Sequence, residues 1–181
     1  MAGLRPGRTH RTHKRPWTRT SKKVAMRAYV KGVPDAKVRI FQMGMARPEN
    51  CEIEADLITS FDCQIRDNAI EAARIMPNTH FEKMIGLENY YFKLRVFPHQ
   101  VLREHSILMG AGADRLSKGM SHPFGRPVGR AARVKKGQTI MTLYTFKRFE
   151  PNAKEGLRRA SMKLQGSCRV VISKKENGHK A

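Results

Sequence analysis

The chain has 181 residues, of which 36 are Lys or Arg and 15 are Asp or Glu, so its formal net charge is +21. Repulsion between that many like charges destabilises a compact state unless a polyanion neutralises it, which makes nucleic acid the first partner to consider. The sequence has no apolar run long enough to span a bilayer and opens on no apolar signal segment, so we expect a cytoplasmic protein without a membrane partner.

Residues 1–32 form a basic segment with ten Lys or Arg and no acid, which we interpret as an RNA-binding extension that cannot fold alone. Its Trp17 could stack on an unpaired base or anchor the extension on the body, and the sequence favours neither. His10 and His13 have no further ligand residues nearby, so an RNA-facing or solvated role is favoured over metal binding. The predicted RNA contacts here are Arg5, Arg8, Arg11, Lys14, Arg15, Trp17, Arg19, Lys22 and Lys23.

Three segments of the first half alternate apolar and polar side chains, which predicts strands over residues 37–41, 52–61 and 90–97. In the third, one face is apolar and the other carries two aromatics with Lys93 and Arg95. That second face suits RNA backbone and sugar, and it equally suits a half-exposed strand stabilised by cross-strand pairs.

A change to helical spacing over residues 66–86 predicts a helix between the second and third strands. Pro77 should kink this helix or split it into two pieces, and Gly86 follows its expected end. The predicted inward face consists of Ala69, Ile70, Ala73 and Met76.

From Pro98 to about Gly129 the alternation stops, so we expect a long internal loop over about residues 98–128. A loop of this length is either disordered or functional, because it contributes little to a core. Gly110 and Gly112 begin like a dinucleotide-binding motif, but the third glycine is missing and no suitable helix follows. We therefore expect no nucleotide cofactor at this position.

The last third predicts two strands over residues 132–146, joined at a turn around Gly137, then a helix over 150–164 and a final strand over 167–173. The helix should bury Ala153, Leu157, Ala160 and Leu164. Its flanks carry a stripe of cations, which in so basic a chain we interpret as a phosphate contact. Residues 176–181 read as a polar tail.

The order of these elements indicates one α+β domain over residues 33–175, with a single mixed sheet and two helices. Residues 1–50 and 91–181 are strongly basic, whereas residues 51–90 carry eight acids against three Lys or Arg. This asymmetry favours one face turned to phosphate and another turned to solvent.

Nothing in the sequence predicts an enzyme or a metal site. The acids of residues 51–90 alternate with apolar side chains, which is typical of a solvated face rather than a catalytic pair. Cys51, Cys63 and Cys168 have no Cys-x-x-Cys spacing, so we expect small buried or half-buried residues and neither a disulfide framework nor a zinc knuckle.

A series of ordered motifs gives the chain a family resemblance. The segments are AGADRLSKGM (111–120), FGRPVGRAARVKKGQ (124–138), GLRRASMKL (156–164) and ISKK (172–175), preceded by GVPDAKVRIFQMG (32–44) and EAARI (71–75). Together they closely resemble the archaeal and eukaryotic L-ten-e ribosomal proteins of the universal L-sixteen family. The resemblance covers about Arg15 to Lys175 and departs most in the basic extension, where Trp17 stands in place of the family's usual tyrosine.

The resemblance implies a hammerhead-like α+β structural constituent of the large ribosomal subunit, without catalysis or cofactor. Its implied partners are 23S-type large-subunit rRNA, neighbouring large-subunit proteins and the acceptor ends of tRNA in the A and P sites. Within the domain, the predicted rRNA contacts are Lys93, Arg95, Arg126, Arg130, Arg133, Arg158, Arg159 and Lys163. The loop implied to approach the peptidyl-transferase centre spans about residues 100–118 and would act through Arg103, His105, Gly110, Gly112, Asp114, Arg115 and Lys118. A free RNA-binding or RNA-processing factor is the alternative interpretation.

Overall fold

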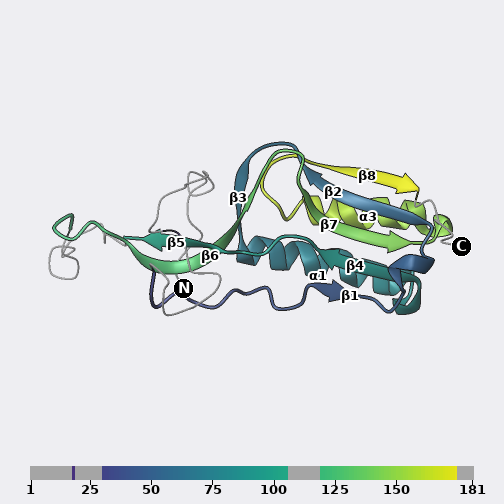
Figure 1. Ribbon diagram of the computed structural model, residues 1–181, viewed down its shortest axis with the longest axis horizontal. Helices are drawn as coiled ribbons and strands as arrows, with labels where there is room; N and C mark the ends of the chain where they lie inside the picture. The colour runs from purple at the N-terminus through teal and green to yellow at the C-terminus, as the bar shows by residue number, and fades with distance from the viewer. Residues whose placement is uncertain (1–17, 19–29, 106–118, 175–181) are drawn as a thin grey trace, which may run out of the picture.

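The computed structural model describes Thr18, residues 30–105 and residues 119–174 (Figure 1). This part of the chain contains two α-helices and eight strands. The strands form two sheets, in which every pairing is antiparallel. The larger sheet has the spatial order β1 (Gln42–Met43), β4 (Tyr90–Leu94), β7 (Thr139–Thr145), β2 (Ile53–Thr59), β8 (Cys168–Lys174). The smaller sheet has the order β3 (Cys63–Arg66), β6 (Arg126–Val134), β5 (Gln100–Glu104).

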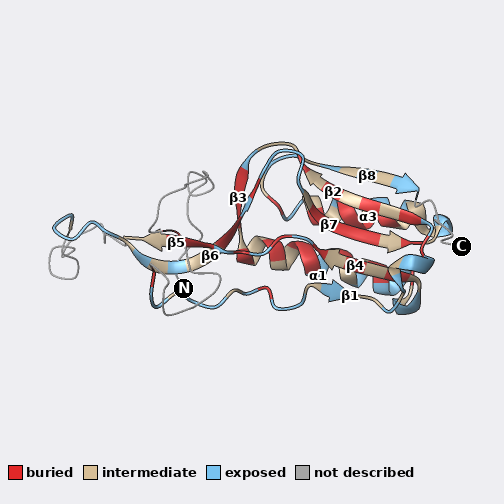
Figure 2. Cartoon of the chain, in the orientation of Figure 1, coloured by how far each residue is buried: buried red, intermediate tan, exposed pale blue. Residues whose placement is uncertain are grey.

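The helices α1 (Asp67–Met84) and α3 (Glu150–Ser161) lie side by side against one face of the larger sheet (Figure 1). The core fills the space between these two layers, where Figure 2 shows the buried residues gathered. Single turns of 3-10 helix at Pro48–Asn50, Leu87–Asn89 and Lys147–Phe149 connect the elements. The predicted α+β class with two helices is confirmed, but two antiparallel sheets replace the single mixed sheet.

Strand β2 and helix α3 form as predicted because each buries one regular face. Residues 53, 55, 57 and 59 of β2 are buried, and their neighbours are only partly covered. All four residues predicted to line the inner side of the last helix are buried, although Leu164 lies beyond the helix end. The strands over residues 90–94 and 168–174 also match their predicted positions.

Helix α1 is one helix through Pro77, so the predicted split into two pieces is wrong. Pro77 is itself buried, and its ring packs in the face formed with Ile70, Ala73 and Phe81. The missing amide hydrogen removes one intrahelical bond, while burial of the ring favours the position. Met76 was placed on this inner face by the helical spacing, but its side chain is 39% exposed and lies on the outer side.

The strand predicted over residues 37–41 is absent from the structure, and pairing starts only at β1. Val38 is buried and Ile40 is 52% exposed, although the two would share a face in a regular strand. The partner strand β4 ends at Leu94, whose amide donates to the Phe41 carbonyl over 2.8 Å. Residues before Phe41 therefore have no strand beside them to pair with.

The stretch predicted as a loop over residues 98–128 contains β5 and the start of β6, paired from Gln100↔Ala131 to Glu104↔Arg126. Alternation is hidden here because consecutive residues Val101 and Leu102 are both buried. Pro127 also argues against a strand in the sequence, but it lies beside a register shift between Leu102 and Arg103.

The turn at Gly137 occurs as predicted, with a backbone φ of +79°. It joins β6 to β7, which belong to different sheets, and so it carries the chain from the smaller sheet into the larger one. One cluster of buried side chains includes members of both sheets and both helices. The domain limits at residues 33 and 175 stay a prediction, since residues 19–29 and 175–181 lie outside the described residues.

Candidate nucleic-acid interface

We call β5, β6 and the connecting residues 119–125 the arm, which projects from the helices and the larger sheet at the end opposite the tip of β8 (Figure 1). Its described residues contain four arginines and a single acid, Glu104. Arg126 and Arg133 are exposed and have no ion pair with any residue in the described ranges. Arg130 instead donates from Nε to the Pro34 carbonyl over 2.8 Å, which fastens the arm to the segment before β1.

The two sides of the arm are joined by contacts near His105 and Gly119. Arg103 donates from Nη1 to the Gly125 carbonyl over 2.9 Å, and its guanidinium lies 4.6 Å from the Phe124 ring centroid. His105 forms a 2.7 Å hydrogen bond between Nε2 and the Gly119 carbonyl. A Cβ on Gly125 would lie 2.8 Å from the Glu104 carbonyl carbon, so the close approach of the two sides requires glycine.

These contacts change the interpretation of two residues predicted to approach tRNA. The structure uses the side chains of Arg103 and His105 within the arm, where they fix its outer end. The other members of that predicted set, Gly110, Gly112, Asp114, Arg115 and Lys118, lie outside the described residues.

The predicted contacts of the basic extension also lie outside the described residues. Of residues 1–29, the structure describes Thr18 alone. Thr18 is buried and accepts a hydrogen bond at Oγ1 from Nε2 of Gln100, the first residue of β5. The extension therefore meets the arm at a buried polar contact. Sequence reasoning missed this pair, because neither residue carries charge or lies in a motif.

On the open face of the larger sheet, Arg95 belongs to a hydrogen-bonded network with acids and hydroxyls. It donates to Thr142 and Tyr144 over 2.8 Å each and pairs with Glu54 at 3.2 Å. Tyr144 in turn donates to Glu54 over 2.9 Å, and burial is the main cause that raises the pKa of its phenol. Cross-strand pairing, one of the two alternatives, accounts for Arg95, whereas Lys93 is half-buried without an ion pair among the described residues.

The cationic stripe on α3 is partly neutralised by its own acids. Glu155 accepts hydrogen bonds from Arg158 at 2.8 and 3.0 Å and from Arg159 at 2.8 Å. These donors, Arg158 first, lower the pKa of Glu155 to about 2. Lys154 is likewise paired with Glu150 at 2.8 Å, but Lys163 has no ion pair within the described part of the chain.

No group of His, Cys, Asp and Glu in the described ranges could hold a metal ion, and no helix there is long and apolar enough to cross a membrane. Cys51 and Cys63 are buried and Cys168 is half-buried, all as free thiols, as the sequence predicts. The described residues thus combine exposed, unpaired arginines on a projecting arm, a buried contact between Thr18 and Gln100, and arginines paired with acids on the larger sheet and on α3.

Comparison with known proteins places these features in a family context. The family model described as ribosomal protein L16p/L10e matches residues 13–171. A large ribosomal subunit protein uL16 of Archaeoglobus fulgidus is 43% identical over 175 residues, which cover 97% of this chain and 94% of the relative. The proteins of the same name from Methanococcus maripaludis strain C7 and Staphylothermus marinus are 44% and 42% identical, over 94% and 98% of this chain and 95% and 98% of the relatives.

Proposed function

The chain belongs to the ribosomal protein L16p/L10e family, and from that premise we propose that it binds large-subunit rRNA through its arm and basic extension and helps position tRNA. It is a structural constituent of the large ribosomal subunit, associated with rRNA and other ribosomal proteins. The family is one of structural, non-enzymatic proteins, and relatives that are subunit components argue against the alternative of a free RNA-processing factor.

The observation that supports the rRNA contact is the difference between paired and unpaired arginines. Arg95 and Arg158 are ion-paired with Glu54 and Glu155, whereas Arg126 and Arg133 are exposed without an acid partner in the described residues. An exposed guanidinium of this kind gains most from a phosphate, which it can contact through two parallel N–H donors. The arm is thus the part of the folded body that we assign to the rRNA backbone.

The tRNA contact is assigned to residues 106–118, which lie between His105 and Gly119 in the sequence. Arg103 and His105 fasten the two sides of the arm, which fixes the positions of these two flanking residues. Gly110 and Gly112 allow a backbone to approach crowded RNA more closely than a side chain would, and Arg115 and Lys118 supply charge. We place this segment near the peptidyl-transferase centre and the acceptor end of tRNA.

Chemical footprinting of large-subunit rRNA tests both contacts, using subunits that contain the whole protein, lack it, or carry a version without residues 108–117. The proposal expects protection at the peptidyl-transferase region that disappears with the deletion, and protection at other helices that survives it. Protection unaffected by the deletion would remove the tRNA part of the proposal. Recovery of the protein only in the ribosome-free supernatant would remove the whole of it.

A further inference from the structure

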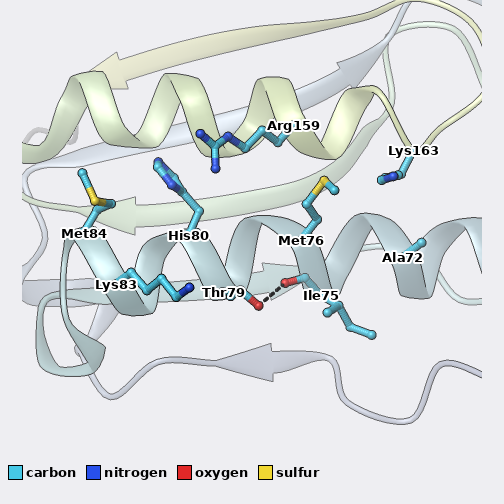
Figure 3. A pocket seen from close by; sticks show the side chains of 9 residues that line it. All are labelled: Ala72, Ile75, Met76, Thr79, His80, Lys83, Met84, Arg159 and Lys163. Atoms are coloured by element: carbon cyan, nitrogen blue, oxygen red, sulfur yellow. Dashed lines mark hydrogen bonds between the residues drawn. The ribbon is translucent and has the colours of Figure 1, made fainter.

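A pocket of about 760 Å³ lies between α1 and α3 on the side that faces away from the larger sheet (Figure 3). Nine residues line it, and they include three cations and four apolar side chains but no acid. Figure 3 shows His80 and Arg159 facing each other across the pocket, with Met76 between His80 and Lys163 along its length. The arginines that support the proposed rRNA interface on the arm do not line this pocket.

The cations of the pocket favour an anionic ligand. The side chains of Lys83 and Lys163 have no ion pair among the described residues. Arg159 uses Nε to bind Glu155 over 2.8 Å, which leaves the other donors of its guanidinium available, and its side chain is 43% exposed. Because a guanidinium and an ammonium both bind phosphate oxygens, these groups match the backbone of a nucleic acid.

The floor of the pocket favours a flat apolar group beside that anion. Ile75, Met76 and Met84 are 49%, 39% and 54% exposed, and methionine sulfur makes favourable contacts with aromatic rings. The His80 imidazole lines the same space, and its buried Nε2 has no hydrogen-bond partner among the described residues. Burial, followed by the nearby charge of Arg159, lowers the pKa of His80, so the ring is neutral at pH 7 and keeps both a donor and an acceptor.

The size of the pocket distinguishes between ligands. Its volume lies within the range of about 300–1,000 Å³ that is typical of sites for small ligands. A stable protein partner would engage roughly 20–30 residues on each side, far more than the nine that line this space. The chain's own basic extension is an unsuitable occupant, since residues 1–32 would bring ten further Lys and Arg and no acid to a cationic site.

We propose that this pocket binds one unstacked nucleotide of large-subunit rRNA, with its base against Met76 and His80 and its flanking phosphates facing Arg159 and Lys163. The inference rests on the proposed function, since it assumes that large-subunit rRNA surrounds the protein. It adds a second RNA site, on the helical layer, in which an extruded base is held in addition to the phosphates. It also gives the predicted contacts Arg159 and Lys163 a role distinct from that of Arg158, which lies outside the pocket.

Photo-cross-linking in assembled large subunits tests the site. A diazirine amino acid replaces Met76 in one full-length variant and Val128, an exposed residue of β6 between Arg126 and Arg130, in a second. We expect the Met76 variant to cross-link to rRNA, with primer extension stopping at a single nucleotide. A cross-link from that position to protein, or none at all, overturns the pocket proposal.

The Val128 variant separates the two proposals. An rRNA cross-link from Val128 without one from Met76 refutes the pocket and leaves the proposed function standing. Failure of both positions to reach rRNA counts against the proposed function as well. Circular dichroism of each variant before assembly verifies that the helices are intact.

A charge reversal in the pocket provides a second test with a matched control. Lys163→Glu, added to the Met76 cross-linking variant, should lower the yield of the rRNA cross-link about tenfold, because it sets a carboxylate against a phosphate. Lys154→Glu makes the same change in net charge within α3 and outside the pocket, and should leave the yield unchanged. Equal losses in the two variants would mean a general charge effect and would refute a specific site.

Discussion

Tyr90 is a completely buried residue with a titratable phenol, so the stability of the folded state depends on pH in the alkaline range. Its side chain is fully buried and its hydroxyl donates to Asn78 Oδ1 over 2.9 Å. Burial, with a smaller contribution from the charge of Glu82, raises the pKa of Tyr90 to about 12. The unfolded chain ionises this phenol near pH 10, so the folded state keeps a proton that the unfolded state has lost.

The stabilising effect of protonated Tyr90 is therefore complete below pH 10 and is lost as the pH rises to about 12. We expect the free energy of unfolding to fall by roughly 2–3 kcal/mol across this window from Tyr90 alone. Urea titrations at pH 9, 10 and 11 on wild type and Tyr90→Phe measure the difference. The variant should lose less stability than wild type on going to pH 11, and parallel losses would contradict the assigned pKa shift.

Among the elements, the packing of α1 on α3 depends on a glycine that faces a ring. A Cβ added to Gly156 would lie 2.1 Å from Cε1 of Phe81, and the Phe81 ring is held by Tyr90 and Phe92 at centroid distances of 5.6 Å. The ring is fully buried. Glycine at this position therefore serves the close approach of the two helices.

Gly156→Ala should destabilise the protein in spite of alanine's higher helix propensity. Overpacking costs about 1–3 kcal/mol, whereas the propensity gain is at most about 1 kcal/mol. Urea denaturation of Gly156→Ala measures the net change. In a Phe81→Leu background the alanine should cost less, and an undiminished cost there would show that the ring is not the cause.

The stability of the arm depends on a few contacts between its two sides. Arg103→Ala removes its hydrogen bond to the Gly125 carbonyl and its contact with Phe124, which together stabilise the arm by about 1–2 kcal/mol. Amide hydrogen exchange in β5 and β6 should then accelerate by about five- to thirtyfold, while exchange in α1 stays unchanged. Arg126→Ala removes a charge without a described contact and serves as the control; equal acceleration in both variants would contradict the bracing role.

The elements also show where sequence patterns suffice and where they fail. β2 and α3 are predictable because each buries one face of regular period, and the acids beside the buried residues of β2 mark the other face. β5 is hidden because Val101 and Leu102 are both covered, which erases the alternation. In α1 the spacing of apolar residues is compatible with two different buried faces. The packing of the helix in the fold decides that Pro77 and Phe81 are buried and that Met76 is not.

The candidate site could also be predicted from the sequence only in part. The cations that bind phosphate are visible in the sequence, but their partners are not, since Arg95 meets Glu54 across 41 positions of the chain. The pocket between the helices was equally hidden, because it depends on two segments separated by more than 70 residues. Charge composition thus predicts the class of partner, and the fold determines which charges remain free to bind it.

At the scale of the whole molecule, the net charge of +21 overstates the number of cations that can contact phosphate. Intramolecular ion pairs already occupy Arg95 and Arg158, whereas Arg126 and Arg133 have no such partner within the described residues. Each phosphate contact releases counterions, so the salt dependence of binding counts contacts rather than total charge. This distinction leads to a quantitative expectation for binding to purified large-subunit rRNA.

The double variant Arg126→Ala and Arg133→Ala should reduce the slope of log K against log salt concentration by about 1.4–1.8, at roughly 0.7–0.9 for each lost contact. Arg158 donates to Glu155 through two nitrogens, so Arg158→Ala should change the slope by less than either single arm variant. Filter binding from 50 to 300 mM salt measures all the slopes with the full-length chain. If Arg158→Ala lowered the slope as much as Arg126→Ala, pairing within the protein would not decide which arginines reach RNA, and the assignment of the arm as the rRNA contact would lose its basis.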